Sequence, residues 1–401
     1  MSTSWSEIPT DLLYSILSKL SIPDLFRSAA VCSHWSAVVD KLRRSPDDQR
    51  PQIPWLVPKG QFLIDGDCNY QNDYNFFSLS EGRVYDIPSP ATRFLKTVVG
   101  SSHGWLITVR KVSVQLLNPI TQVHINLPST PTVGGRNLVA IKAVLSSDPS
   151  GGGDYSVVFV FYSRSMRKEF LFFVNAGDEK WKMITGDGYH YDDIAFDKGK
   201  LYAVTRSKEH AEVMVAAYDL ITLNSNPTWT PVVALSDFIW AFDVVSYFLC
   251  TSSDDLLLTR IMTKKSEHLY INKWEVCKVK KVEYYINILD VLKVDTEEGV
   301  TIKMNNLGKY TLFLSATSSL CIDTCSLPDL RSNYIYILND LCEIGYRDNL
   351  VYNMEDESFT SLSLPPLSSP RRRRSLLSPP KLQRPVVVWF APSIALHADP
   401  M

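Results

Sequence analysis

Short runs of β-branched and aromatic residues recur along most of the chain, and they constrain its fold more than any other feature. Residues 155–162 and 169–174 are two such runs, and a turn-forming segment at 175–177 follows the second. Many short strands at even spacing are typical of all-β sandwiches, barrels and propellers. Further runs of the same kind are 112–117, 200–204, 213–218 and 310–314.

A spaced series of tryptophans favours the propeller among these folds. Trp181, Trp229 and Trp274 each open a short apolar run, at intervals of 48 and 45 residues. A period of about 40–50 residues with four strands in each repeat is typical of propeller blades. The sequence therefore predicts a propeller of about five to seven blades. Large core tryptophans that are spaced by chance would give the same series.

The N-terminal residues have a helical periodicity instead. Apolar side chains on the first expected helix form a stripe wider than one packing face requires, and they are Leu12, Leu13, Ile16, Leu17 and Leu20. Pro23 suits the first turn of a second helix, and residues 33–44 are expected to form a third. A unit of about 40 residues seldom buries enough apolar surface to be stable alone. We therefore expect it to dock on a partner, the alternative being a helical cap whose leucines all belong to the core.

Shifts in composition indicate the domain organisation. The helical unit is expected over residues 1–44, a proline-rich linker over 45–61 and a β-rich domain over 62–396. Within that domain a Pro/Ser/Arg segment at 366–384 has too little apolar surface to pack, so we expect a disordered insert there. The predicted fold class is multidomain α plus β, with a small three-helix unit before a mainly-β, propeller-type domain.

Charge and hydropathy limit the expected partners. A net charge of −2 and a pI of about 6.4 give no global positive field for nucleic acid or anionic lipid. No run approaches the roughly 18 apolar residues of a membrane span, and no basic stretch leads into an apolar run as in a signal peptide. The 7 cysteines are few and odd in number. We expect a nuclear or cytoplasmic protein without a nucleic-acid or membrane partner.

Thirteen positions near the N-terminus agree with one motif in order and spacing, and they are Trp5, Ile8, Pro9, Asp11, Leu12, Leu13, Ile16, Leu20, Asp24, Leu25, Val31, Cys32 and Trp35. The segment resembles the F-box over its whole length. The resemblance implies binding to a Skp-family adaptor, which joins the chain to a cullin. The residues that it places mainly toward the adaptor are Ile8, Pro9, Leu12, Leu13, Ile16 and Leu17. Those that it shares between the adaptor and the core of the unit are Leu20, Leu25, Val31, Cys32 and Trp35.

A second group of motifs lies in the β-rich region, at residues 104–106, 117–121, 127–128, 193–196, 199–204, 333–336 and 389–393. They resemble the plant F-box proteins that carry the domain of unknown function 295, a kelch-like and propeller-like domain, over roughly residues 62–396. Tyr334 departs from that family, which usually has a cysteine there. The basic residues at 371–374 depart from it as well.

Catalytic and metal-binding patterns are weak. Asp192-Asp193 and Asp254-Asp255 are paired carboxylates, but acid–base chemistry needs carboxyl groups from different segments, so we interpret both pairs as turn residues. Cys321 and Cys325 have no second pair at zinc spacing, and Cys342 alone does not complete a set. We therefore expect buried free thiols, no metal site and no cofactor.

A basic run interrupts the C-terminal region and consists of Arg371, Arg372, Arg373 and Arg374. We interpret it as a nuclear-import candidate. Phosphorylation of Ser375 or Ser378 would add negative charge beside it. A solvated surface loop is the alternative.

Together these features predict the substrate-recognition subunit of a Skp–cullin–F-box ubiquitin ligase, which is not itself an enzyme. The helical unit would dock on the adaptor while the β-rich domain holds a target protein near the ubiquitin-charged enzyme. The loops with most latitude for a target are 128–137, 146–154 and 222–231. The alternatives are a propeller-fold hydrolase with a helical cap and an F-box protein that acts as a non-degradative regulator.

Overall fold

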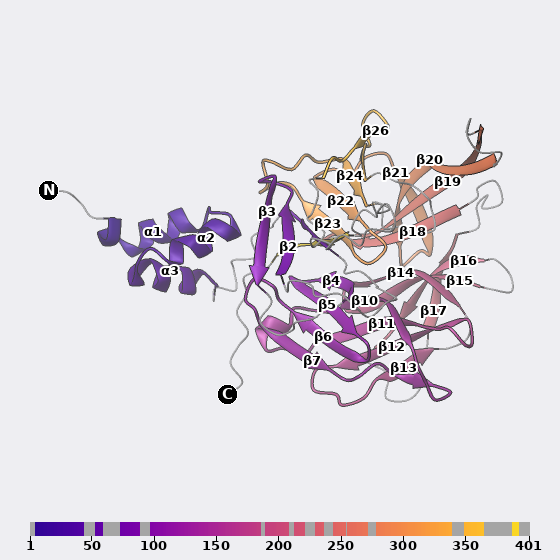
Figure 1. Ribbon diagram of the computed structural model, residues 1–401, viewed down its shortest axis with the longest axis horizontal. Coiled ribbons are helices and arrows are strands. Elements are labelled where there is room, and N and C mark those ends of the chain that lie inside the picture. The colour runs from indigo at the N-terminus through magenta and orange to yellow at the C-terminus, as the bar shows by residue number, and fades with distance from the viewer. Residues whose placement is uncertain are drawn as a thin grey trace, which may run out of the picture.

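The computed structural model of the chain has an N-terminal helical unit beside a ring of β-sheets (Figure 1). The structure describes residues 5–43, 53–58, 73–88, 97–185, 189–207, 212–220, 229–235, 244–253, 255–271, 278–338, 349–364 and 387–392. None of the helices within these ranges combines the length and the apolar character that crossing a membrane requires.

The helical unit contains the three α-helices that the periodicity predicts. They are α1 (Thr10–Leu17), α2 (Ile22–Ala29) and α3 (Ser33–Arg43), preceded by the 3-10 turn η1 (Trp5–Glu7). Pro23 lies in the first turn of α2, where a missing N–H group breaks no helical hydrogen bond. The inward side chains form one closed core, which consists of Leu13, Leu17, Ile22, Leu25, Val38, Val39 and Leu42.

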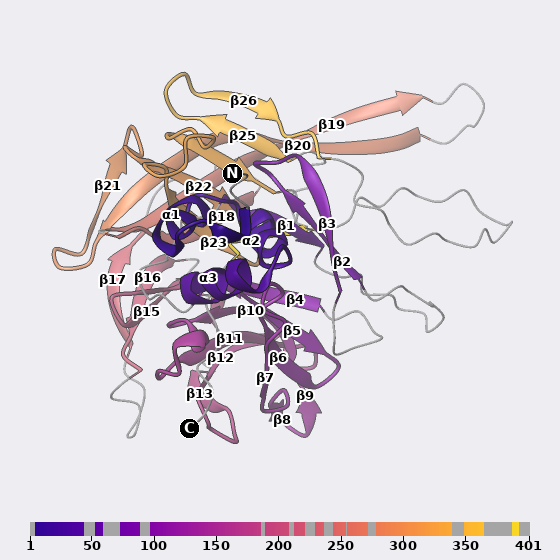
Figure 2. The same cartoon turned by 90° about the vertical axis from the view of Figure 1, so that its left-hand side faces the viewer.

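Six sheets form the ring and confirm the predicted propeller, with six blades (Figure 2). Blade one consists of β27 (Val387–Phe390), β1 (Trp55–Pro58), β2 (Asp73–Ser78) and β3 (Arg83–Pro88). Blade two consists of β4 (Thr97–Ser102), β5 (Trp105–Arg110), β6 (Ser113–Leu117) and β7 (His124–Leu127). Blade three consists of β10 (Val139–Leu145), β11 (Ser156–Ser163), β12 (Lys168–Asn175) and β13 (Lys182–Thr185).

The remaining blades complete the ring. Blade four consists of β14 (His190–Asp197), β15 (Lys200–Arg206), β16 (Val213–Tyr218) and β17 (Trp229–Ala234). Blade five consists of β18 (Val244–Thr251), β19 (Leu256–Ile271), β20 (Lys278–Asp295) and β21 (Val300–Met304). Blade six consists of β23 (Ser319–Asp323), β22 (Tyr310–Leu314), β24 (Tyr334–Ile337), β25 (Leu350–Asn353) and β26 (Ser358–Ser361). The connections hold a small ladder of β8 (Thr132–Val133) and β9 (Arg136–Asn137) and the 3-10 turn η2 (Pro149–Gly151).

The first-named strand of each blade lies innermost, where β27, β4, β10, β14, β18 and β23 contact one another in turn. Trp389 on β27 closes the ring against blade six. Its indole N–H donates to the carbonyl oxygen of Leu314 at 3.1 Å, and its own carbonyl oxygen accepts from Ser318 Oγ at 3.0 Å. Blade one therefore combines strands from both ends of the chain.

The strand β1 corrects the prediction of a linker over residues 45–61. Trp55, Leu56 and Val57 are buried in the core of blade one. The prolines around this apolar run suggested a linker, but here they lie at the ends of a short strand, where a missing N–H group is tolerated. Residues 45–52 and 59–61 and the predicted insert at 366–384 lie outside the described residues, so the domain boundaries stay a prediction.

The tryptophan repeat holds in two blades. Trp181 directly precedes β13, and Trp229 opens β17, the outermost strands of blades three and four. Trp274 lies outside the described residues. In chain order it falls between β19 and β20, whereas the outermost strand of blade five is β21, so the series does not extend to that blade.

Bulges interrupt three innermost strands near their starts. The extra residues are Val99 on β4, Ile141 on β10 and Asp192 on β14. A bulge bends its strand and redirects the neighbouring side chains. After the first bulge, a Cβ atom at Gly100 would overlap the carbonyl oxygen of Ala143, so only glycine allows β4 to approach β10 this closely.

The helical unit lies against one face of the ring (Figures 1 and 2). Ile120, in the turn between β6 and β7, packs against the helical core. The guanidinium carbon of Arg27 on α2 lies 5.6 Å from the ring centroid of Tyr85 on β3. We name this side of the propeller the proximal face and the opposite side the distal face.

Contacts between neighbouring blades assign the other turns to these two faces. Trp105, at the start of β5, donates through Nε1 to Asp148 Oδ1 at 2.9 Å, which places the β10–β11 turn on the proximal face. Because strands alternate in direction within a blade, the β11–β12 turn lies on the distal face. Glu169, next to that turn, contacts His190, so β14 begins on the distal face. Arg206 then links the end of β15 to the start of β18 on the same face.

Candidate functional site

Apolar side chains remain exposed on the helical unit although its core is closed. Leu12 and Ile16 are four residues apart on α1, and they are 60% and 47% exposed. Val31, which follows α2, is 59% exposed, and Trp5 is 72% exposed. Side chains at this spacing lie on one face of a helix. We name the exposed pair, Leu12 and Ile16, the apolar stripe.

Leu13 and Leu17 correct the expectation that they face an adaptor. Both are fully buried in the core of the helical unit, and so is Leu25. Leu13 follows Leu12 by one position, and Leu17 follows Ile16. One position along a helix turns a side chain by about 100° around the helix axis. The two leucines thus stabilise the unit itself.

The other residues that were expected to bind the adaptor differ in exposure. Pro9 is exposed like the apolar stripe and Val31. The partly buried residues are Ile8, Leu20, Cys32 and Trp35. Adaptor binding by the exposed and partly buried residues stays a prediction.

His34 fixes the segment that leads into α1, a role that no sequence pattern indicated. Its Nε2 atom lies 3.1 Å from the carbonyl oxygen of Ile8. The neighbouring Trp35 donates its indole N–H to the carbonyl oxygen of Trp5 at 3.2 Å. These contacts span 26 and 30 residues of sequence, which is why spacing alone could not show them.

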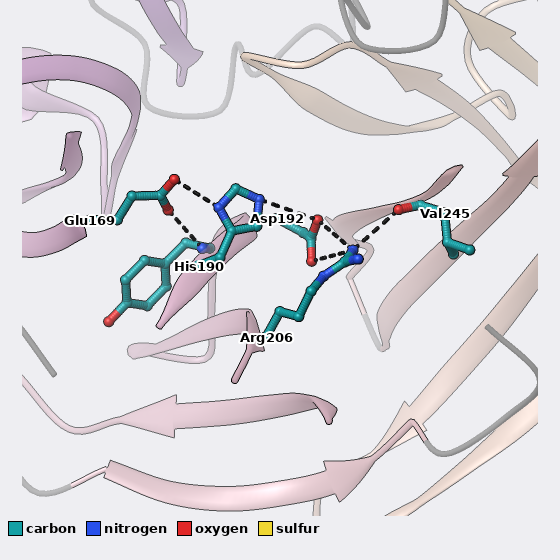
Figure 3. Close-up of polar contacts among 6 residues, drawn as sticks. Glu169, His190, Asp192, Arg206 and Val245 are labelled. Atoms are coloured by element: carbon teal, nitrogen blue, oxygen red, sulfur yellow. Dashed lines mark hydrogen bonds and ion pairs between the residues drawn. The ribbon is translucent and has the colours of Figure 1, made fainter. Parts of the chain in front are cut away.

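Four charged side chains meet on the distal face where blades three, four and five adjoin (Figure 3). Nδ1 of His190 lies 2.7 Å from Oε1 of Glu169, and its Nε2 lies 3.8 Å from Oδ1 of Asp192. Nη2 of Arg206 donates to the two oxygens of Asp192 at 3.0 and 3.1 Å, and to the carbonyl oxygen of Val245 at 3.2 Å. We name Glu169, His190, Asp192 and Arg206 the distal charge cluster.

The environment shifts two titrations in the distal charge cluster. The hydrogen bond that His190 donates to the Glu169 carboxylate stabilises the imidazolium and raises the pKa of His190. Burial raises the pKa of Asp192, against the opposing attraction of Arg206. The contacts of His190 within the described residues are to carboxylates and to no hydroxyl or thiol group. Within the described residues the histidine therefore activates no hydroxyl or thiol, and its contacts are electrostatic.

A buried ion pair joins the innermost strands near the middle of the ring. Lys142 on β10 pairs with Asp193 on β14, and both side chains are almost fully buried. The carboxylate also accepts from the backbone N–H of Leu249 on β18 at 2.8 Å and from Ser319 Oγ on β23 at 3.2 Å. One carboxylate thus connects four blades. Removing it would leave a buried ammonium group without its counter-charge.

The interpretation of Asp192 and Asp193 as turn residues is wrong. Both lie within β14 at its bulge, and they bind different partners. A bulge redirects successive side chains, so two carboxylates that are adjacent in sequence serve separate contacts. Asp255 does lie in a turn, between β18 and β19, and pairs with Lys293 at 2.6 Å. Asp254 is outside the described residues.

The cysteines show no metal site in the part of the chain that is described. There, no group of three or more His, Cys, Asp or Glu side chains could hold a metal ion. Burial raises the pKa of the Cys321 thiol to about 12. Cys325 is exposed, which corrects the expectation that both thiols are buried. It follows the end of β23 in a proximal connection. Cys342 lies outside the described residues.

The loops that were expected to have most latitude lie on different faces. Residues 128–137 run beside the distal β5–β6 turn, since Thr130 donates its backbone N–H to the carbonyl oxygen of Val112 at 2.8 Å. Residues 146–154 lie on the proximal face, and their Pro149 and Ser150 are buried. Residues 222–228 of the third loop are outside the described residues. So are the import candidate Arg371–Arg374 and the phosphorylation candidates Ser375 and Ser378.

Two family models match the chain. Residues 5–48 match the F-box-like model, and residues 76–353 match the model described as the KIB1-4 β-propeller. The pairing of an F-box with a propeller is therefore confirmed. The matching description is KIB1-4 β-propeller, and the number 295 of the expected resemblance is not part of it.

The similar curated proteins are from Arabidopsis thaliana. F-box protein At5g25290 is 26% identical over 202 residues, which cover 49% of this chain and 46% of the relative. The chain thus spans about half the length of the first relatives that it matches. F-box/kelch-repeat protein At1g57790 is 22% identical over 359 residues, which cover 88% of this chain and 87% of the relative.

The similar solved structures are distant. The WD40 domain of SCAP from fission yeast aligns with a TM-score of 0.30 at 11% identity, over 61% of this chain and 60% of that chain. The six blades described above rest on the pairing of the strands alone.

Proposed function

The chain belongs to the KIB1-4 β-propeller family and carries an N-terminal F-box, and from this we propose that it is the substrate-recognition subunit of a Skp–cullin–F-box ubiquitin ligase. An F-box implies a Skp1-type adaptor as its partner. The proposal adds the cullin, a target protein held by the propeller, and the absence of a catalytic role for this chain.

The apolar stripe is the observation that carries the proposal. The core of the F-box is closed by seven residues that include Leu13 and Leu17, and Leu12 and Ile16 take no part in it. Full burial of an exposed leucine or isoleucine contributes about 1.5–3 kcal/mol, and a partner that covers Leu12 and Ile16 gains about half of that from each, because each is about half exposed. An adaptor that covers α1 would supply that gain.

The arrangement of the two domains suits a substrate receptor. The F-box lies on the proximal face, so an adaptor bound to it would leave the distal face of the propeller open to a target. The receptor needs no catalytic group, because holding a target near a ubiquitin-charged enzyme raises its effective concentration.

Co-purification with the partners tests the proposal. The full chain is expected to bind a Skp-family adaptor and, through it, a cullin, and to support ubiquitin transfer to a bound protein. A variant with Leu12→Ala and Ile16→Ala should lose adaptor binding and, with it, cullin binding and ubiquitin transfer. Adaptor binding without cullin recruitment would favour a non-degradative regulator instead. Failure of the wild-type chain to bind any Skp-family adaptor would refute the proposal.

We also propose that the protein acts in the nucleus and the cytoplasm, with the arginines at 371–374 as the import signal. The charge of this run and its serine neighbours supports the idea. A fluorescent fusion of the full chain should shift toward the cytoplasm when the four arginines are replaced by alanine. An unchanged nuclear fraction would contradict this role.

A further inference from the structure

Charged residues in the turns are distributed unevenly between the two faces of the propeller, although the proximal turns also hold Lys180 and Lys198. The proximal turns carry carboxylates, among them Glu81, Asp148, Asp178, Asp197, Asp255 and Asp295. The distal side of blades two to four carries cations, which are Lys111, Arg136, Arg164, Arg167, Lys168 and Arg206. The whole chain has a net charge of only −2, so an excess of one sign does not explain this separation.

Two distal turns repeat the same combination of side chains. In the β5–β6 turn, Lys111 is followed by Val112, which is 38% exposed. In the β11–β12 turn, Met166 is 48% exposed and lies between Arg164 and Arg167. An exposed aliphatic group therefore stands beside cations at the tip of both turns. The loop with Arg136 runs beside the first of them, through the contact of Thr130 with Val112.

Four of these cations, all exposed, differ from Arg206, which is paired with Asp192. Within the described residues, Lys111, Arg136, Arg164 and Lys168 take part in no ion pair. The carboxylates of the distal charge cluster are already paired with its histidine and arginine. Glu212, at the start of β16, is an exposed carboxylate on this side. Among the described residues, the distal face of blades two to four thus carries more cations than carboxylates.

We propose that this distal surface binds an acidic segment of a target protein, one that also carries aliphatic side chains. The cations would attract and orient the carboxylates, while Val112 and Met166 would contact the apolar groups. That the ligand is a degradation target rests on the proposed function, whereas the binding itself does not. Sequence-independent binding of single-stranded nucleic acid combines cations with aromatic stacking groups. The exposed apolar groups at these two turns are aliphatic, which favours an acidic protein segment.

Fluorescence anisotropy with the full-length chain tests the surface. The probe is a fluorescein-labelled pool of short peptides randomised among aspartate, glutamate, leucine and glycine. The comparison pool has lysine and arginine in place of the acidic residues. We expect the acidic pool to bind more tightly than the basic pool and to weaken as salt is added. Replacing two exposed cations of one turn, Arg164→Glu with Lys168→Glu, should weaken acidic binding roughly tenfold.

The choice of residues keeps the fold intact. Arg167 and Lys111 have φ angles of 53°, a conformation that few side chains adopt, so they stay unchanged. The matched control, Lys180→Glu with Lys200→Glu, makes the same change of charge at exposed proximal positions. The control should keep the wild-type affinity within about twofold.

Three results would overturn the proposal. They are equal binding of the two peptide pools, equal weakening by the distal and proximal variants, and tighter binding of a single-stranded oligoribonucleotide than of the acidic pool. The assay contains no adaptor or cullin. Its failure would therefore leave the ligase proposal standing, and failure of adaptor co-purification would not affect the peptide result.

Discussion

Leu12 and Leu13 are neighbours on α1 with opposite surroundings, so replacing each of them separates adaptor binding from folding. Leu12 is 60% exposed. Full burial of a leucine contributes about 1.5–3 kcal/mol, so an adaptor that covers this fraction gains about 1–2 kcal/mol from it. At about 1.4 kcal/mol per tenfold change in affinity, Leu12→Ala should weaken adaptor binding by up to about 5–30-fold.

Leu13→Ala acts on the core instead. The side chain of Leu13 has no exposed surface and packs among the three helices. Removing a buried leucine side chain costs about 2–5 kcal/mol, which includes the cavity that it leaves. That is a large part of the stability that so small a unit can have. We expect the helices of this variant to melt at a lower temperature and adaptor binding to fall because the F-box unfolds.

Titration calorimetry with the adaptor and thermal melting followed by circular dichroism distinguish the two effects. Leu12→Ala should lose affinity and keep the wild-type melting temperature. Leu13→Ala should lower the melting temperature, and Val39→Ala, another fully buried position, serves as its matched control. The reasoning is refuted if Leu12→Ala binds like the wild type, or if it melts as early as Leu13→Ala.

Other perturbations test the ring itself. Asp193→Ala should lower the free energy of unfolding in urea by about 3–5 kcal/mol, because it leaves Lys142 buried and unpaired. The double variant Lys142→Met with Asp193→Leu should recover much of that loss. An equal loss in the single and the double variant would contradict the ion-pair argument. The Glu169 carboxylate raises the pKa of His190 above its ordinary value of 6.5. The contact between His190 and Glu169 therefore stabilises the folded state fully below pH 6.5, and this stabilisation is lost as the pH rises through the raised pKa. His190→Gln should accordingly lower the melting temperature more at about pH 5.5 than at about pH 9, and a difference that does not change with pH would exclude this role. Gly100→Ala should cost about 1–3 kcal/mol by forcing β4 from β10, whereas Gly151→Ala, with open space around it, should change the unfolding free energy little.

Local patterns predicted the elements, because the residues that form them are close in sequence. The run at 155–162 corresponds to β11 and the run at 213–218 to β16. The interval between Trp181 and Trp229 reflects the repeat of whole blades. The sequence did not indicate a strand at residues 55–58, because one of its two partners, β27, lies more than 300 residues later and supplies burial that the local pattern does not show.

The distal charge cluster could not be predicted from spacing. Glu169 and His190 lie 21 residues apart, and Arg206 follows Asp192 by 14, with no regular motif between them. Which of them meet depends on how two blades are placed side by side. Asp192 itself was noticed as half of an acidic pair, but its role depends on a bulge that turns it away from Asp193. The sequence of α1 likewise does not distinguish the exposed Leu12 and Ile16 from the buried Leu13 and Leu17, because the packing of the other two helices decides which side is covered.

Blade one has a consequence for the order in which the protein matures on the ribosome. Its outer strands end at Pro88, but its innermost strand begins at Val387, after about 300 further residues. At about 5–20 residues per second, translation separates the two by roughly 15–60 s. During that time the F-box is already complete, whereas β1 has an open hydrogen-bonding edge and the other blades have no closed ring to join. An adaptor present during synthesis would therefore meet a nascent chain that can dock before its propeller has closed.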